Sequence, residues 1–212
     1  MCMKERIGMK QNKEKQTKVI GVMGGVGSGK TELLNYLESQ YGAIVIMADR
    51  VAEMLMQPGT ETMDSLRCDL PPSMFLENGE INKNKMAEHI FQHPEERLKI
   101  NQVVHPAVVQ WIIKKLTTVP EGSFVVLESA LLIEARMDVF CDEVWYIYAD
   151  KEMRIQRLID SRGYSMEKIQ AIMDAQCSDQ EFLAGADAII DNTGDICKMK
   201  AQVDALLLVR EK

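Results

Sequence analysis

Eight consecutive residues near the N-terminus have the composition of a phosphate-binding loop. The octet fits the pattern of a glycine, four residues, a second glycine, a lysine and a hydroxyl residue. Glycines let the backbone turn its N–H groups inward around phosphate oxygens. Lys30 can reach the terminal phosphates of a nucleotide, and the Thr31 hydroxyl can bind Mg²⁺. The octet therefore predicts binding of a nucleoside triphosphate through Gly25, Val26, Gly27, Ser28, Gly29, Lys30 and Thr31.

Two acidic residues follow predicted strands. Asp49 comes just past an apolar run at 43–47, and Glu128 ends another at 123–127. In open parallel sheets the ligand lies beyond the carboxyl ends of the strands. A carboxylate there can deprotonate an attacking hydroxyl or bind a metal-bound water. The alternative for Asp49 is capping of the helix that follows, and for Glu128 it is a solvated strand end.

Three arginines lie in a charged segment after the fourth predicted strand. Arg154 and Arg157 are three residues apart and share one face of a helix, and Arg162 follows them. Mobile arginines that close on the charge of a transferred phosphoryl group are a common solution in phosphoryl transfer. Closure also excludes water. The alternative is an ordinary solvated helix.

The elements that position these residues alternate between strand and helix. Apolar runs predict five strands, at 18–23, 43–47, 123–127, 143–148 and 186–190. Helices are expected at 31–40 and from about 51, and several helical segments are expected across 57–120. A helical hairpin is expected from about 151 to 183, split at 161–164, and residues 203–209 are expected to belong to a closing helix. Pro94 favours a helix start, whereas His105-Pro106 predicts a break in that helix. This alternation predicts an α/β fold with a five-stranded parallel sheet flanked by helices.

The composition limits the partners and the compartment. Of the 212 residues, 25 are basic and 32 acidic, so the formal net charge is −7 and a general nucleic-acid partner is not expected. No apolar run approaches the ~20 residues of a membrane span. The basic leader 1–17 is expected to be disordered, and it lacks the apolar core of a secretory signal. Five scattered cysteines show no metal or redox spacing. We therefore expect a cytoplasmic protein, a monomer or weak oligomer without a membrane partner.

His89 and His93 are four residues apart, which is a spacing seen in metal sites. Pro94 follows at once, and no glutamate of the zinc-protease pattern lies between them. We therefore interpret the pair as part of a surface helix end and not as a metal site.

The order of further motifs resembles the dephospho-coenzyme A (dephospho-CoA) kinase family from about Val19 to Leu207. After the octet come Ala48-Asp49-Arg50-Val51-Ala52, Gln57-Pro58-Gly59, Asn78-Gly79-Glu80-Ile81-Asn82-Lys83, His105-Pro106, Leu131-Leu132-Ile133-Glu134, Ala175-Gln176 and Ala186-Asp187-Ala188-Ile189-Ile190-Asp191-Asn192-Thr193-Gly194. The octet alone fits many kinases, whereas this order of motifs is far more discriminating.

The resemblance implies ATP-dependent phosphorylation of the ribose 3′-hydroxyl of dephospho-CoA, the last step of coenzyme A (CoA) synthesis. It implies a nucleotide-binding core at 18–58, 121–150 and 184–212, a helical insertion at 59–120 that binds the acceptor, and a lid at 151–183. Asp49 would act as the base, with Lys83, His105 and Glu128 in the acceptor site. Lys30, Arg157 and Arg162 would serve the transfer. Asn192 and Gly194 would lie near the adenine of ATP.

Several residues depart from the family pattern. Glu32 stands where a small hydroxyl residue is usual, and Met47 replaces an acid. In the third strand and the loop after it, Glu128 replaces an aspartate, Ala130 a proline and Ile133 a phenylalanine. Lys83 and Asp179 stand where arginines are common, and an acid near a bound phosphate inverts the local charge. Two alternatives therefore stay open: a nucleoside or nucleotide kinase of the same architecture, and a nucleotide-binding paralogue without turnover.

Overall fold

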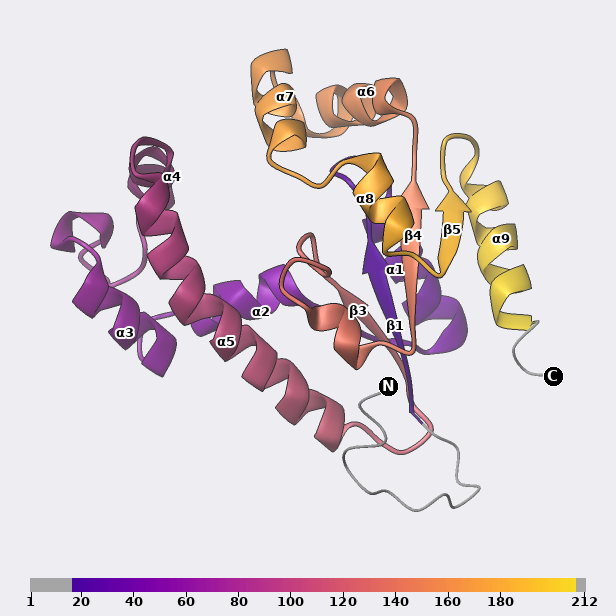
Figure 1. The fold of residues 1–212 in the computed structure, drawn as a ribbon, viewed down its shortest axis with the longest axis horizontal. Helices are drawn as coiled ribbons and strands as arrows, with labels where there is room; N and C mark the ends of the chain where they lie inside the picture. The colour runs from indigo at the N-terminus through magenta and orange to yellow at the C-terminus, as the bar shows by residue number, and fades with distance from the viewer. Residues whose placement is uncertain (1–16, 209–212) are drawn as a thin grey trace. The chain divides into compact units, whose positions relative to one another are not determined.

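The computed structural model describes residues 17–208 (Figure 1). The predicted leader, apart from residue 17, and the last residue of the predicted C-terminal helix, Val209, lie outside the described residues. The chain divides into two compact units. One contains the described residues of Met1–Ile46 and Pro120–Lys212, and the other is Met47–Val119.

A five-stranded parallel sheet forms the centre of the first unit, which confirms the predicted fold. Its spatial order is β2-β3-β1-β4-β5, so the chain passes from the central β1 to the edge strand β2, returns to β3 beside β1, and then runs outward through β4 and β5 on the other side. β1 pairs in parallel with β3 and β4, and β4 pairs in parallel with β5. The strands are β1 Lys18–Met23, β2 Ile44–Met47, β3 Phe124–Glu128, β4 Glu143–Tyr148 and β5 Ala188–Asp191.

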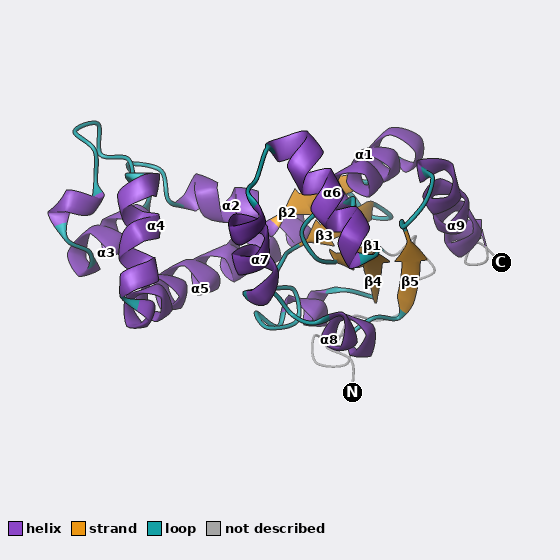
Figure 2. Ribbon diagram, turned by 90° about the horizontal axis from the view of Figure 1, so that it is seen from above, coloured by secondary structure: helices purple, strands orange, loops and turns teal. Residues whose placement is uncertain are grey.

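Helices cover both faces of this sheet. α1 and α9 lie on one face and α8 on the other (Figure 2). Leu33 and Leu37 of α1 and Met199 and Val203 of α9 are fully buried, because their spacing places them on the face that meets the sheet. The helices of this unit are α1 Lys30–Tyr41, α6 Lys151–Arg162, α7 Met166–Asp174, α8 Asp179–Ala184 and α9 Ile196–Leu208, with a short 3₁₀ helix, η3, at Met137–Phe140.

Local capping divides the helical segment after β4. The predicted split of the hairpin at 161–164 is confirmed, because Gly163 in the left-handed region ends α6. The second half of the hairpin differs from the expectation: it is two helices, because the Ser178 side chain caps α8. The closing helix contains the predicted residues 203–208 and begins earlier, at Ile196. The Asp195 side chain accepts the N–H of Cys197 and thereby supplies the start that the apolar pattern did not indicate.

The second unit is helical. α3 and α4 each begin at a side-chain cap, since Thr60 accepts the N–H of Met63 and Asn82 accepts that of Lys85. The unit begins at Met47, so it groups α2 with the insertion, whereas we expected residues up to 58 in the core. Its elements are α2 Ala48–Leu55, α3 Glu61–Asp69, η2 Pro72–Met74, α4 Lys83–Gln92 and α5 Pro94–Thr118.

The predicted helix break at His105-Pro106 is wrong, because α5 continues through Pro106. Proline gives up the hydrogen bond to the carbonyl four residues earlier, here that of Gln102. Pro106 and Gln102 are both exposed, so water can donate a hydrogen bond to the Gln102 carbonyl. On the opposite face Val104, Val108 and Ile112 are buried at helical spacing, and their packing outweighs the lost bond.

No helix within residues 17–208 is both long enough and apolar enough to cross a membrane.

Candidate active site

The glycine-rich octet connects the central strand β1 to α1, at the point where the order of the sheet reverses. Gly24, Gly27 and Gly29 have φ angles of 155°, 79° and 96°, which residues with a side chain rarely adopt. A Cβ atom at Gly29 would lie 2.1 Å from Asn192 Nδ2. The loop therefore requires glycine for its backbone angles and for the close approach of neighbouring side chains.

Lys30 folds back over this loop. Its Nζ donates to the Gly24 carbonyl at 2.7 Å and lies 4.0 Å from Glu128 Oε1. Glu128 is only 5% exposed at the end of β3, so the alternative of a solvated strand end is wrong. Thr31 is exposed in the first turn of α1. Glu32, which departs from the family pattern, is the next residue and is also exposed.

Two arginines of α6 contact the backbone of the loop. Arg157 donates to the carbonyls of Gly27 and Ser28, each at 3.4 Å, and to the Asn192 carbonyl at 2.8 Å. Arg154 donates from Nε to the Val26 carbonyl at 3.0 Å and is 7% exposed. The alternative of a solvated helix is therefore wrong for both residues.

Arg162 is placed differently. It is the last residue of α6 and is exposed, with its guanidinium 5.9 Å from the centre of the Tyr164 ring. Its role in a lid stays a prediction.

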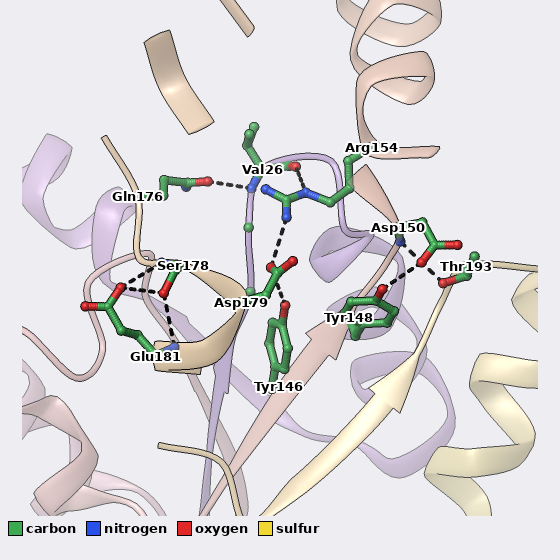
Figure 3. Close-up of polar contacts among 12 residues, drawn as sticks. Val26, Tyr146, Tyr148, Asp150, Arg154, Gln176, Ser178, Asp179, Glu181 and Thr193 are labelled. Carbon is green, nitrogen blue, oxygen red and sulfur yellow. Dashed lines mark hydrogen bonds and ion pairs between the residues drawn. The ribbon is translucent and has the colours of Figure 1, made fainter. Parts of the chain in front are cut away.

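The start of α6 is fixed near the end of β5. The Asp150 side chain accepts a hydrogen bond from the Tyr148 hydroxyl at 2.6 Å, and the Asp150 N–H donates to Thr193 Oγ1 at 3.4 Å (Figure 3). These contacts hold the helix that carries Arg154 and Arg157 beside the phosphate loop.

Asn192 follows β5 and is 4% exposed. Its Nδ2 donates to the Ser28 carbonyl at 2.8 Å, so this amide braces the loop. Gly194 lies in the exposed turn that leads to α9. The expected proximity of both residues to adenine stays a prediction.

Gln176, which the sequence indicated only as a family motif, contacts the same loop. Its Oε1 accepts the N–H of Val26 at 2.8 Å, from the connection between α7 and α8 (Figure 3). The contact joins residues 150 positions apart. The residues around Gln176 in the sequence do not predict its contact with Val26.

The loop retains features that fit a polyphosphate. The Ser28 hydroxyl is buried and has no hydrogen-bond partner among the described residues. Lys30 supplies a cation, and α1 presents the positive end of its dipole. An anion with several acceptor oxygens would satisfy these groups.

Three of the residues expected to act on the acceptor, Asp49, Lys83 and His105, are carried by the second unit, whereas Glu128 belongs to the first. Asp49 is exposed in the first turn of α2; the cap position is Met47, without a side-chain hydrogen bond, so the capping alternative is wrong. Lys83 is exposed at the start of α4, and its Nζ lies 3.0 Å from Glu53 Oε1. His105 is half-buried in α5.

The His89 imidazole forms a hydrogen bond with Glu96. Its Nε2 lies 2.7 Å from Glu96 Oε2, and the rings of His89 and His93 are 4.7 Å apart. The hydrogen bond from His89 lowers the pKa of Glu96. Within residues 17–208, no group of three or more histidine, cysteine or acidic side chains could hold a metal ion.

The comparisons with known proteins agree with this architecture. A family model described as dephospho-CoA kinase matches residues 18–198. A dephospho-CoA kinase from Staphylococcus haemolyticus is 32% identical over 191 residues, covering 90% of this chain and 94% of that protein. One from Staphylococcus aureus is 33% identical over 192 residues, with coverages of 90% and 92%.

Solved structures share the fold. The protein TT1252 of Thermus thermophilus has a TM-score of 0.79 and 26% identity, covering 92% of this chain and 99% of that one. A Campylobacter jejuni dephospho-CoA kinase has a TM-score of 0.66 at 20% identity, with coverages of 91% and 97%. The chain therefore belongs to the dephospho-CoA kinase family, with the fold of a P-loop kinase.

Proposed function

We propose that this protein performs its family's reaction, the ATP-dependent phosphorylation of dephospho-CoA, by in-line transfer to the ribose 3′-hydroxyl. Membership of the family makes it a kinase of this small-molecule substrate in CoA synthesis. The observation that carries the mechanism is the convergence of Lys30 and Arg157 on the glycine-rich loop. Both are cations, and phosphoryl transfer depends mainly on positioning and on stabilisation of phosphate charge.

The loop would hold ATP through its backbone N–H groups, the Ser28 hydroxyl and Lys30. In the nucleotide complex, Lys30 Nζ would exchange the Gly24 carbonyl for phosphate oxygens, and the loop amide of Val26 would exchange Gln176 for the same ligand. Arg157 lies on the loop already, so we propose that it stabilises the charge of the transferred group. Arg162 and the rest of 151–183 would act as the lid, and Asn192 with Gly194 would border the adenine.

The acceptor would be activated by Asp49. Chain order supports this assignment, because Asp49 is the second residue after the end of β2 and is exposed. The 3′-oxygen of dephospho-CoA forms a bond to the γ-phosphorus while the bond from that phosphorus to the bridging oxygen breaks. Asp49 takes the hydroxyl proton, and ADP leaves. The insertion at 59–120, with Lys83 and His105, would bind the remainder of dephospho-CoA, and Glu128 would lie toward the acceptor.

Thr31 is the residue proposed to hold Mg²⁺. Thr31 is exposed in the first turn of α1, and the Glu128 carboxylate lies 4.0 Å from Lys30 Nζ; a hydroxyl and a carboxylate are oxygen donors of the kind that this ion prefers. When bound, Mg²⁺ neutralises charge on the terminal phosphates. We further propose a cytoplasmic enzyme, a monomer or weak oligomer that acts without a nucleic-acid or membrane partner.

The direct test is an acceptor screen with Mg-ATP. We expect ADP and CoA from dephospho-CoA, and no comparable product from nucleosides or nucleotides. Phosphorylation of a nucleoside without turnover of dephospho-CoA would overturn the proposal. So would calorimetric binding of ATP without product from any acceptor, the behaviour of a regulatory paralogue.

The role of Asp49 is tested by Asp49→Asn. We expect unchanged ATP binding and a loss of about 10²–10⁴ in turnover, the usual scale for a general base. Asp64→Asn is a matched control, because Asp64 is also exposed in the first turn of a helix of the same unit. Wild-type turnover in Asp49→Asn would show that another group takes the proton.

A further inference from the structure

Asp179, which stands where an arginine is common in the family, accepts hydrogen bonds from two side chains. Its Oδ1 accepts hydrogen bonds from the Tyr146 hydroxyl at 2.7 Å and from Nη1 of Arg154 at 3.3 Å (Figure 3). The Arg154 side chain is 9% exposed and that of Asp179 44%. The negative charge of Asp179 is therefore compensated by a buried guanidinium.

The guanidinium of Arg154 lies directly on the backbone of the phosphate loop. Its Nε donates to the Val26 carbonyl, and a Cβ atom at Gly25 would lie 2.1 Å from its NH2. Because Gln176 accepts the N–H of the same Val26, both polar groups of that residue's backbone are held from outside the loop.

The Asp179 carboxylate is itself held rigidly. Ser178 and Glu181 form a capping box around the first turn of α8, in which each side chain accepts a backbone N–H of the other residue. The Tyr146 ring stacks on Phe182 of α8, with centres 5.1 Å apart. Burial and the bond to Asp179 raise the pKa of Tyr146, so its hydroxyl stays a donor at neutral pH. Sheet and helix thus fix the acceptor for Arg154.

We propose that Asp179 is a positioning residue for nucleotide binding: it holds Arg154 against Val26, and Arg154 holds the phosphate loop in its binding conformation. The proposal rests on ATP as the ligand of this loop. A buried guanidinium without its acceptor is strongly disfavoured, so loss of the carboxylate displaces Arg154 and frees the loop. Positioning of this kind contributes to ATP binding and leaves the acceptor and the proton transfer unaffected.

The opposite expectation comes from charge alone. If Asp179 acted as an acid beside a phosphate, its removal would strengthen ATP binding. The two interpretations therefore predict opposite signs for the same variant.

Asp179→Ala and Asp179→Asn separate them, with ATP affinity measured by calorimetry and by KM. We expect Asp179→Ala to raise the Kd and KM for ATP about tenfold, with kcat and the KM for dephospho-CoA unchanged within about twofold. Asp179→Asn keeps an oxygen acceptor for Arg154 and Tyr146 and should recover most of the affinity. Gln180→Ala, an exposed neighbour on α8, is the control for the helix itself and should bind ATP as the wild type does.

Coupling to Arg154 is tested by the double variant. Arg154→Met should weaken ATP binding at least as much as Asp179→Ala, and Arg154→Met combined with Asp179→Ala should bind no worse than Arg154→Met alone. If Asp179→Ala does not fold, Tyr146→Phe removes one donor to the carboxylate and should weaken ATP binding about threefold. Unchanged or tighter ATP binding in Asp179→Ala, or in Tyr146→Phe if Asp179→Ala does not fold, would overturn the proposal, as would equal losses in kcat and both KM values. Calorimetry with ATP alone gives this result even if dephospho-CoA is not the acceptor.

Discussion

The two ends of α1 offer a matched pair of substitutions, Gly29→Ala and Gly42→Ala. Gly29 is the N-cap and Gly42 the C-cap of this helix, and both have positive φ, 96° and 63°. A Cβ at Gly42 would meet nothing within 4 Å, whereas a Cβ at Gly29 would lie 2.1 Å from Asn192 Nδ2. The two substitutions therefore share a backbone cost and differ in one contact.

The size of each effect follows from these contacts. An L-residue in the left-handed region costs about 1–2 kcal/mol, and the lower entropy of the unfolded alanine chain offsets about 0.4–1 kcal/mol of that. Gly42→Ala should therefore lower the free energy of unfolding by about 1 kcal/mol. Gly29→Ala must also displace the buried Asn192 amide from the Ser28 carbonyl, which adds about 1–3 kcal/mol.

The assay is urea denaturation of both variants beside ATP calorimetry. We expect Gly29→Ala to be less stable than Gly42→Ala by about 1–3 kcal/mol. Its ATP affinity should fall at least about tenfold, that is by about 1.4 kcal/mol, because the brace on the loop is lost. Gly42→Ala should bind ATP like the wild type. Equal stability of the two variants, with equal ATP affinity, would refute the role assigned to Asn192.

Three further predictions concern separate parts of the chain. Lys30→Ala should weaken ATP binding at least about a hundredfold in calorimetry while circular dichroism stays unchanged, since phosphate charge is then uncompensated; retained affinity would contradict the assignment. Burial, together with the hydrogen bond to Glu134, raises the pKa of Cys177 to about 12. Glu134→Gln should therefore accelerate alkylation of this thiol at pH 8, as measured by peptide mass spectrometry. An unchanged rate would contradict the contribution of Glu134 to the raised pKa. The hydrogen bond from His89 lowers the pKa of Glu96 from 4.5 in the folded state. The contribution of Glu96 to the free energy of unfolding is therefore present above pH 4.5 and is lost as the pH falls through the folded pKa. Denaturation at a series of pH values should show that His89→Ala loses less stability than the wild type below pH 4.5, and parallel curves for the two proteins would contradict this prediction.

The sheet could be predicted from the sequence because its three central strands, β1, β3 and β4, are buried along most of their length. Such strands are continuous apolar runs, and 143–148 was located from its sequence alone with the boundaries of β4. Helix ends were harder to predict. The proline at 106 looks like a break in the sequence, but it lies on the exposed face of α5, and the sequence does not state which face is exposed.

The site divides in the same way. The glycine-rich octet is contiguous, so its chemistry can be predicted from spacing alone. The side chains that hold it come from distant positions: Gln176 lies 150 positions from Val26, and Asp179 lies 25 positions from Arg154. Neither residue type nor position in the chain identifies these partners, and for Asp179 the departure from the family pattern did not reveal its pairing with Arg154.

The pairing of charges decides which cation can serve the transferred phosphate. Arg154 lies within ion-pair distance of Asp179, and Lys30 lies 4.0 Å from Glu128. The hydrogen-bond acceptors of Arg157 among the described residues are backbone carbonyls, those of Gly27, Ser28 and Asn192. Carbonyls orient a guanidinium without cancelling its charge. Arg157 therefore brings a net positive charge to the loop, whereas Arg154 and its carboxylate partner bring rigidity, so an acid at position 179 is compatible with a site that binds polyphosphate.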